Sequence, residues 1–325
     1  MGIERFLQPK SLEEALALLG AEGEKAQVVA GGTDVMVALR NGSLDPRRTC
    51  FIDIGRIEGL AGVRTLAGSS GLPVTGLRIV ELGSATTHAV LTSDATVRDS
   101  SLILGMAAHC VGSPQIRNRG TLGGNIVTAA QCADTIPALL ALDAELVLRK
   151  AGGGERVVAI RDFFPSPKRT AIAPDELMTA VRYTALSRSE GWLGSYYKLI
   201  RRAAVAKARL SFAILVRISA EGVLTDARIS IGSTLPTPGR FPTAEALLRG
   251  TPVGPLGKSG APQPAGTGAD KGALRERVDA VADACVDYLI QQAGRRWSSE
   301  YKEPAVRNVV RRELSVLLGL EAAHD

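Results

Sequence analysis

The sequence predicts an α+β protein, with two small α/β subdomains followed by an α+β domain of antiparallel strands and helices. Three observations support this fold class. A chain of 325 residues is longer than a typical single domain. Residues 1–57 alternate short apolar strands with helical patterns, whereas the chain after residue 170 shows several strands and then two long helices. We therefore expect domains at 1–57, 58–168 and 169–325.

The N-terminal subdomain is predicted from local signals. Ser11 and Glu14 form a capping box that begins a helix, and Gly20 stands where that helix would stop. A helix flanked by two short buried strands follows, with the strands at 27–30 and 49–54 and the helix at 35–40.

The second subdomain has a mixed pattern. An alternating strand is expected within 76–87 and a long helix over 93–110, followed by a stretch rich in Gly, Asn and Thr at 112–132. A helix over 133–141 precedes a hairpin over 145–160 that turns at 152–154.

The C-terminal part predicts an antiparallel sheet with strands at 176–183, 196–200, 210–218 and 227–231, and a turn at 220–222. Helices over 271–293 and 299–318 follow. Between sheet and helices, residues 250–269 contain six Gly and four Pro, so we expect a flexible loop there.

Composition excludes several classes of protein. Hydrophobic residues at 45% and charged residues at 22% are normal for a globular chain and exclude a mainly disordered one. The net charge of +6 comes without an RNA-binding aromatic signature or zinc-finger spacing, so no nucleic-acid partner is expected. No stretch of eighteen uncharged apolar residues and no signal peptide is visible, which predicts no membrane span.

The cysteines show no metal-binding pattern. Cys50, Cys110, Cys132 and Cys285 form no C-x-x-C pair, so we expect no metal or iron–sulfur site in this chain. Four reduced thiols in a cytoplasmic protein are the simplest interpretation.

The strongest local motif is the strand that runs into Gly31, Gly32, Thr33 and Asp34 before a helix. Glycines let backbone N–H groups approach an anion, and a diphosphate is a natural occupant. Strand–glycine–helix junctions also serve only to turn the chain, so this motif alone leaves both interpretations open.

A second glycine motif spans Arg117 to Ile126. It can be a glycine-rich surface turn, or a second backbone cradle with Thr121 and Asn125 as hydrogen-bonding groups. Two such motifs, far apart in the chain, fit one extended ligand with two phosphates and a large ring.

The chain resembles the FAD-binding subunit of molybdenum hydroxylases through two motifs, V-V-A-G-G-T-D and R-N-x-G-T-L-G-G-N-I. This family includes xanthine dehydrogenase and the medium subunit of carbon monoxide dehydrogenase. The likeness covers nearly the whole chain. It includes the stretches 51–54, 83–88, 137–144, 162–164, 176–179 and 198–202.

The resemblance implies a fold and a set of cofactor-binding residues. The fold is an N-terminal FAD domain of two subdomains, of the vanillyl-alcohol-oxidase-like (PCMH) type, followed by a C-terminal α+β domain. No catalytic side chain is implied, and none is expected to bind a metal. The implied FAD-binding residues are Val28, Val29, Ala30, Gly31, Gly32, Thr33, Asp34, Val35, Val111, Thr121, Leu122, Gly123, Gly124, Asn125, Asp134, Met178 and Lys198.

Four of these residues have simpler alternatives. Asp134 can be the N-cap of the helix that follows it, and Lys198 can be a solvated surface charge. Met178 and Val111 can be core residues. The basic cluster of Lys198, Arg201, Arg202, Lys207 and Arg209 can be a solvated face. It can also stabilise an anionic reduced flavin, or dock an acidic partner or a nicotinamide cofactor.

Departures from the family pattern are also informative. One branch of the family, which resembles 4-hydroxybenzoyl-CoA reductase, carries four extra cysteines after the second glycine motif, but here residues 126–145 contain only Cys132. His88, His109 and His324 do not form a covalent flavin-attachment pattern, so the resemblance implies non-covalent FAD.

The leading hypothesis is an electron-transfer flavoprotein subunit. Its implied partners are a molybdopterin-containing large subunit and a small subunit with two [2Fe-2S] clusters, assembled as two copies of each of the three subunits. NAD, a quinone, ferredoxin or oxygen would be the external acceptor. A stand-alone flavin oxidase and a non-catalytic nucleotide-binding protein are the alternatives.

Overall fold

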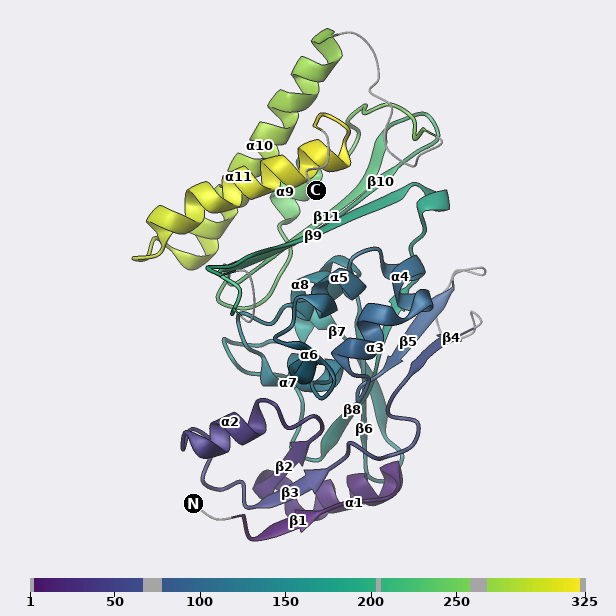
Figure 1. The fold of residues 1–325 in the computed structure, drawn as a ribbon, viewed down its shortest axis with the longest axis vertical. Helices are drawn as coiled ribbons and strands as arrows, with labels where there is room; N and C mark the ends of the chain where they lie inside the picture. Colours follow the sequence, from purple (N-terminus) through teal and green to yellow (C-terminus); the bar gives the residue numbers. More distant parts are fainter. Residues whose placement is uncertain (1–2, 67–77, 203–205, 258–267, 322–325) are drawn as a thin grey trace.

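Three sheets lie in three tiers along the longest axis of the molecule (Figure 1). The computed structural model describes residues 3–66, 78–202, 206–257 and 268–321. The chain begins in the lowest tier of the figure, and its last described helices cover the highest. The combination of helices with antiparallel sheets confirms the predicted α+β class.

The N-terminal tier is a parallel sheet in the order β1-β3-β2, with bounds Arg5–Leu7, Cys50–Asp53 and Ala26–Val29. α1 (Leu12–Glu22) begins where the capping box predicts, since the Glu14 N–H donates to Ser11 Oγ over 3.1 Å. It runs past Gly20 and ends at Gly23, whose φ is +52°. α2 (Val35–Arg40) has the predicted bounds, whereas the three-residue β1 was not predicted.

The middle tier is a five-stranded antiparallel sheet in the order β4-β5-β8-β6-β7. The predicted hairpin is confirmed, and β4 was not predicted. The strand expected at 176–183 forms, but its assignment to the C-terminal sheet is wrong, because β8 pairs with β5 and β6. An alternating pattern identifies a strand but carries no information about its neighbours. The bounds are β4 (Val63–Leu66), β5 (Ile79–Gly83), β6 (Glu145–Lys150), β7 (Glu155–Ala159) and β8 (Glu176–Thr184).

Short helices cover the middle sheet. The single helix expected over 93–110 is wrong: α4 ends at Leu102, which has a left-handed φ of +62°. Ser101 stabilises the break, because its hydroxyl accepts the N–H of Leu104 at the start of α5 while donating to the Val97 carbonyl of α4. The helices are α3 (His88–Ser93), α4 (Ala95–Ser101), α5 (Leu104–His109), α6 (Pro114–Arg117), α7 (Leu122–Thr128) and α8 (Thr135–Ala141).

The C-terminal tier is an antiparallel sheet of β9 (Trp192–Leu199), β10 (Leu210–Ile218) and β11 (Leu224–Gly232). The predicted turn at 220–222 joins β10 to β11. Side chains alternate along β10: Phe212 and Ile214 pack toward the helices of this tier, and Ala213 and Leu215 pack into the middle tier. One continuous core therefore joins the middle tier to this sheet.

Three helices cover the outer face of the C-terminal sheet, namely α9 (Pro242–Leu248), α10 (Gly268–Ala293) and α11 (Ser299–Leu317) (Figure 1). Of the loop expected over 250–269, residues 258–267 lie outside the described part, and the last two residues belong to α10. Short 3₁₀ turns occur at Gly23–Lys25, Ile160–Asp162 and Arg188–Glu190.

Candidate functional site

Three segments meet where the N-terminal and middle tiers join, and we call them together the glycine junction: residues 30–34, 84–88 and 119–125. A Cβ atom added to Gly31 would lie only 1.9 Å from the Arg119 carbonyl oxygen. The Gly123 N–H donates to the Ser84 carbonyl over 2.8 Å. The structure therefore brings the two predicted glycine motifs into direct contact, although about ninety residues separate them in the chain.

The first glycine motif presents backbone amides. The N–H groups of five consecutive residues, Gly31 through Val35, have no acceptor among the residues that the structure describes. Gly32 has a left-handed φ of +73°, and an added Cβ there would meet only ordinary contacts at 3.7 Å. Gly32 is thus required for the turn of the backbone, whereas Gly31 is required for close packing.

The second glycine motif uses its amides differently. Thr121 caps α7 by accepting the Gly124 N–H, and the Leu122 N–H donates to the Thr86 carbonyl over 2.9 Å. With the Gly123 bond to Ser84, these N–H groups are already satisfied by the protein. The Asn125 side chain also accepts a hydrogen bond, from Thr135 Oγ1 over 2.6 Å. The sequence predicted a second open cradle of amides, and here the structure shows a capped helix start instead.

A buried ion pair lies beyond the junction. Lys198 Nζ donates to Asp134 Oδ2 over 2.8 Å and to the Cys110 carbonyl over 2.7 Å, and both charged side chains are less than a tenth exposed. Asp134 Oδ1 is buried without a partner. Burial raises the pKa of Asp134 from 3.8 to about 6, and Lys198 opposes this rise.

The simpler alternatives for these two residues are wrong. Asp134 precedes α8, but its side chain makes no capping hydrogen bond. Lys198 is not solvated, because β9 alternates and directs this residue toward the middle tier. Met178 is a core residue at 2% exposure, whereas Val111 is half-buried in the turn after α5, where its carbonyl accepts from Arg117 over 3.1 Å.

Sequence reasoning missed Tyr196. This residue lies two positions before Lys198 on β9, and its hydroxyl donates to the Asp134 carbonyl over 2.9 Å. The two-residue period of a strand is the signal that could have identified it, because Tyr196 and Lys198 share a face. Two side chains of the C-terminal sheet therefore hold Asp134: Tyr196 binds its backbone carbonyl and Lys198 binds its carboxylate.

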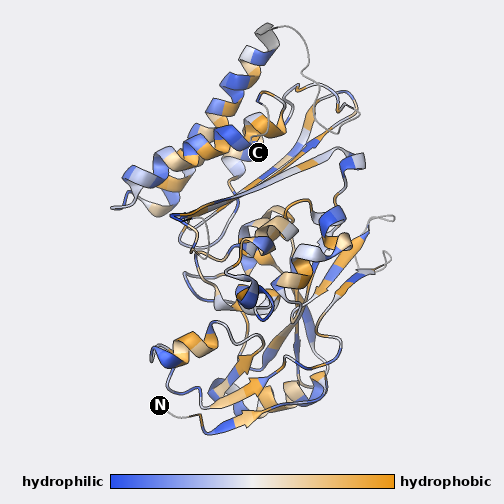
Figure 2. Cartoon of the chain, in the orientation of Figure 1, coloured by the Kyte–Doolittle hydropathy of each residue, from blue (hydrophilic) through white to orange (hydrophobic). Residues whose placement is uncertain are grey.

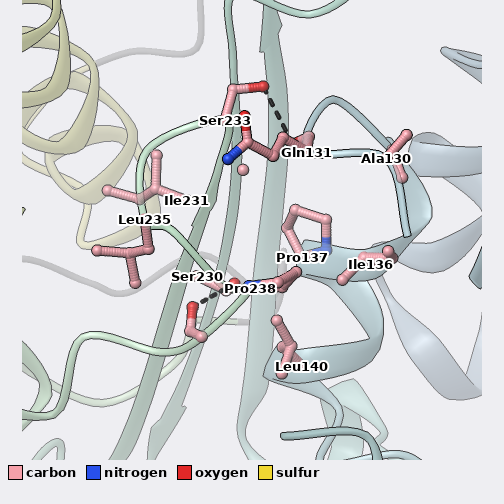
Figure 3. Close-up of a pocket in the computed structure, with 13 residues that line it drawn as sticks. Ala130, Gln131, Ile136, Pro137, Leu140, Ser230, Ile231, Ser233, Leu235 and Pro238 are labelled. Atoms are coloured by element: carbon pink, nitrogen blue, oxygen red, sulfur yellow. Dashed lines mark hydrogen bonds between the residues drawn. The ribbon is translucent and has the colours of Figure 1, made fainter. Parts of the chain in front are cut away.

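The structure divides the predicted basic cluster. Lys198 is buried in the ion pair, whereas Arg201, Arg202, Lys207 and Arg209 line an open depression of about 380 Å³. A separate pocket between α8 and β11 is lined by Ile136, Pro137 and Ser230, among others (Figure 3). Its volume of about 20 Å³ holds roughly one water, so this pocket is a packing gap between two tiers.

Metal ligands do not gather in the described ranges, where no three His, Cys, Asp or Glu residues lie close enough to hold an ion. Over the same residues, no helix combines the length and the apolar character that crossing a membrane requires.

Comparison with known protein families gives two matches. Residues 2–183 match the family model described as the FAD binding domain in molybdopterin dehydrogenase. Residues 195–256 match the CO dehydrogenase flavoprotein C-terminal domain.

Individual proteins and solved structures agree with these matches. The nicotinate dehydrogenase FAD-subunit of Eubacterium barkeri is 31% identical over 76% of this chain and 80% of its own length. The carbon monoxide dehydrogenase medium chain of Hydrogenophaga pseudoflava is 29% identical over 94% of both chains. A solved structure of carbon monoxide dehydrogenase from the latter organism, lacking the Mo-pyranopterin moiety of its cofactor, superposes with a TM-score of 0.78 and 28% identity over 97% of both chains.

Proposed function

Because the chain belongs to the family of FAD binding domains in molybdopterin dehydrogenases, we propose that it is the electron-transfer flavoprotein subunit of a molybdenum hydroxylase. FAD is the cofactor of this family, and the chain is an oxidoreductase component. When bound, FAD supplies the redox chemistry; the protein binds and orients it. No side chain of this chain needs to act as a general acid or base.

The five amides of Gly31 through Val35 carry the proposal for where the cofactor binds. Consecutive N–H groups without protein acceptors leave several donors free, which suits the oxygens of a diphosphate. We assign the FAD diphosphate to Val28–Val35, with Thr121–Asn125 packed against that segment. In this arrangement the second motif fixes the shape of the first, and Asn125 retains its NH₂ group as a donor.

The flavin end is assigned to Asp134, Lys198, Met178 and Val111. The unpartnered Asp134 Oδ1 can accept an N–H donor, and the Lys198 ammonium provides a fixed positive charge beside it. Met178, at 2% exposure, supports this end from within the core, and Val111 contributes a backbone turn next to Cys110, whose carbonyl holds Lys198.

The partners of this chain are part of the proposal. The relatives are named as FAD subunits or medium chains, which supports a complex with a molybdopterin-containing large subunit and a small subunit with two [2Fe-2S] clusters. Electrons would pass from FAD to an external acceptor such as NAD, a quinone, ferredoxin or oxygen. We expect the complex to be a dimer of heterotrimers. All four cysteines are free thiols, as suits the reducing cytoplasm in which we place the complex.

The visible spectrum of the purified chain tests the proposal. We expect flavin absorption, and release of FAD on heating, because non-covalent attachment is implied. A chain that is colourless alone and stays colourless when purified in complex with its neighbouring subunits contradicts the proposal. Substrate oxidation by the isolated flavin-loaded chain would instead favour a stand-alone oxidase.

Replacing Gly32 with valine will weaken FAD binding by at least about tenfold, because a β-branched residue is strained at a φ of +73° and the open amides would change direction. Gly42 gives a matched control. Its φ is +66°, nothing lies within 4 Å of an added Cβ, and it lies outside the junction. Gly42→Val should cost similar stability without changing the FAD dissociation constant, measured by flavin fluorescence. Equal affinity in both variants would remove Gly32 from the site.

A further inference from the structure

The segment 84–88 is part of the glycine junction, although neither glycine motif contains it. The His88 N–H donates to the Gly120 carbonyl over 3.0 Å, and Thr87 forms a β-bridge with Thr121. Together with the bond from Leu122 to Thr86, these contacts fasten the segment along the second glycine motif.

Ser84 places an unpartnered hydroxyl in this wall. The residue is 4% exposed, and its Oγ has no hydrogen-bond partner. Its Cβ would lie 2.8 Å from a Cβ added to Gly123, so the side chain lies against the first turn of α7. An alanine at position 84 would fill this space without burying a polar atom.

His88 places a second unpartnered group between the two glycine motifs. The residue is 2% exposed, and its Nδ1 has no partner. A Cβ added to Gly120 would lie 3.2 Å from His88 Cδ2 and 3.5 Å from Thr33 Oγ1, so the imidazole and the first motif approach the same point. Burial, assisted by Arg117, lowers the pKa of His88 to about 4, which keeps the ring neutral near pH 7.

Buried polar atoms without partners are rare, because each loses its hydrogen bonds to water and gains nothing in return. Among the described residues, four side chains have such an atom: Ser84, His88, Asp134 and Ser211. The first two lie in the glycine junction, and Asp134 lies at the assigned flavin end. Ser211 lies in the C-terminal sheet against Gly232, which lines the pocket large enough for one water.

We propose that Ser84 and His88 are further cofactor-binding residues, which complete their hydrogen bonds with the ribityl-diphosphate chain of FAD. Ser84 donates from its hydroxyl to an oxygen of that chain, and the neutral imidazole of His88 bonds to another oxygen or hydroxyl. This inference rests on the proposed function. It assigns to the segment 84–88 the part of FAD between the diphosphate at Gly31–Val35 and the flavin at Asp134.

Ser84→Ala in the full chain tests the inference, with Ser315→Ala as the matched control. Both serines are 4% exposed, but Ser315 lies in α11, away from the junction and from Asp134. We expect Ser84→Ala to raise the dissociation constant for added FAD about tenfold, measured by flavin fluorescence, without lowering the melting temperature of the FAD-free chain. Ser315→Ala should leave the FAD dissociation constant unchanged.

His88→Phe provides a second measurement, since it keeps a ring of similar shape and removes both nitrogens. Weaker FAD binding in a variant that still melts cooperatively supports the inference. Wild-type affinity in both Ser84→Ala and His88→Phe overturns it and leaves the proposed function intact. A wild-type chain that binds no FAD, alone or in complex, would overturn the proposed function itself.

Discussion

Replacing Gly31 with alanine will force the two glycine motifs apart and abolish FAD binding. The new Cβ would lie 1.9 Å from the Arg119 carbonyl oxygen and 2.6 Å from its carbon. Both partners are backbone, so no side-chain rotation relieves the contact. We expect a loss of about 3 kcal/mol in the free energy of unfolding, the upper range for overpacking.

Gly20→Ala is the control for this prediction. Gly20 is a helical residue of α1, and an added Cβ there would meet only Ala151 at 3.8 Å. That variant should be as stable as the wild type or slightly more so, because alanine favours a helix. Denaturant unfolding and flavin content measure both effects. A Gly31→Ala chain with normal flavin content and normal stability would contradict the close packing of Gly31 against the Arg119 carbonyl.

Lys198→Met will destabilise the chain by about 3 kcal/mol at pH 8, because it leaves the Asp134 carboxylate buried without its cation. The loss should shrink toward pH 5. In the folded chain burial holds the pKa of Asp134 at about 6, above its ordinary 3.8, so this carboxyl contributes stability below pH 3.8 that disappears as pH rises through 6. Lys198 opposes that rise, so in Lys198→Met the pKa of Asp134 increases further. The variant therefore keeps losing stability, relative to the wild type, as the pH rises above 6.

A double-mutant cycle with Asp134→Asn isolates this effect. In the Asp134→Asn background no carboxyl titrates at this position, so the cost of Lys198→Met should become nearly independent of pH. Urea unfolding at pH 5 and pH 8 gives the four free energies that are needed. A pH-independent cost of Lys198→Met in the wild-type background would contradict the coupling between the two residues.

Local signals in the sequence predicted local structure well. The N-cap at Ser11 and the helix of α2 depend on neighbouring residues, and both are found where expected, although the Glu14 carboxylate accepts the N–H of Lys10 and not that of Ser11. The break at Leu102 was not predicted, because the apolar run that follows it, residues 102–108, reads as a continuation of the helix. The partners of β8 were not predicted either, since pairing depends on the whole sheet.

The candidate site shows the same division between local and long-range information. The open amides follow from a local glycine motif, and the family resemblance singled out Asp134 and Lys198 individually. Their contact joins residues 64 positions apart on different tiers, and the role of Tyr196 depends on that contact. The closure of the second cradle by Ser84 and Thr86 likewise arises from a segment that the glycine pattern does not include.

The placement of Tyr196 and Lys198 on β9 has a consequence for how this protein can evolve and be engineered. The matched FAD binding domain ends at residue 183, so both residues that hold Asp134 lie outside it. The N-terminal region and the C-terminal sheet are therefore not interchangeable modules. A chimera that takes its C-terminal half from a relative will keep the buried aspartate neutralised only if the donor strand carries Lys at the position of Lys198. Recombination between members of this family is constrained at that strand.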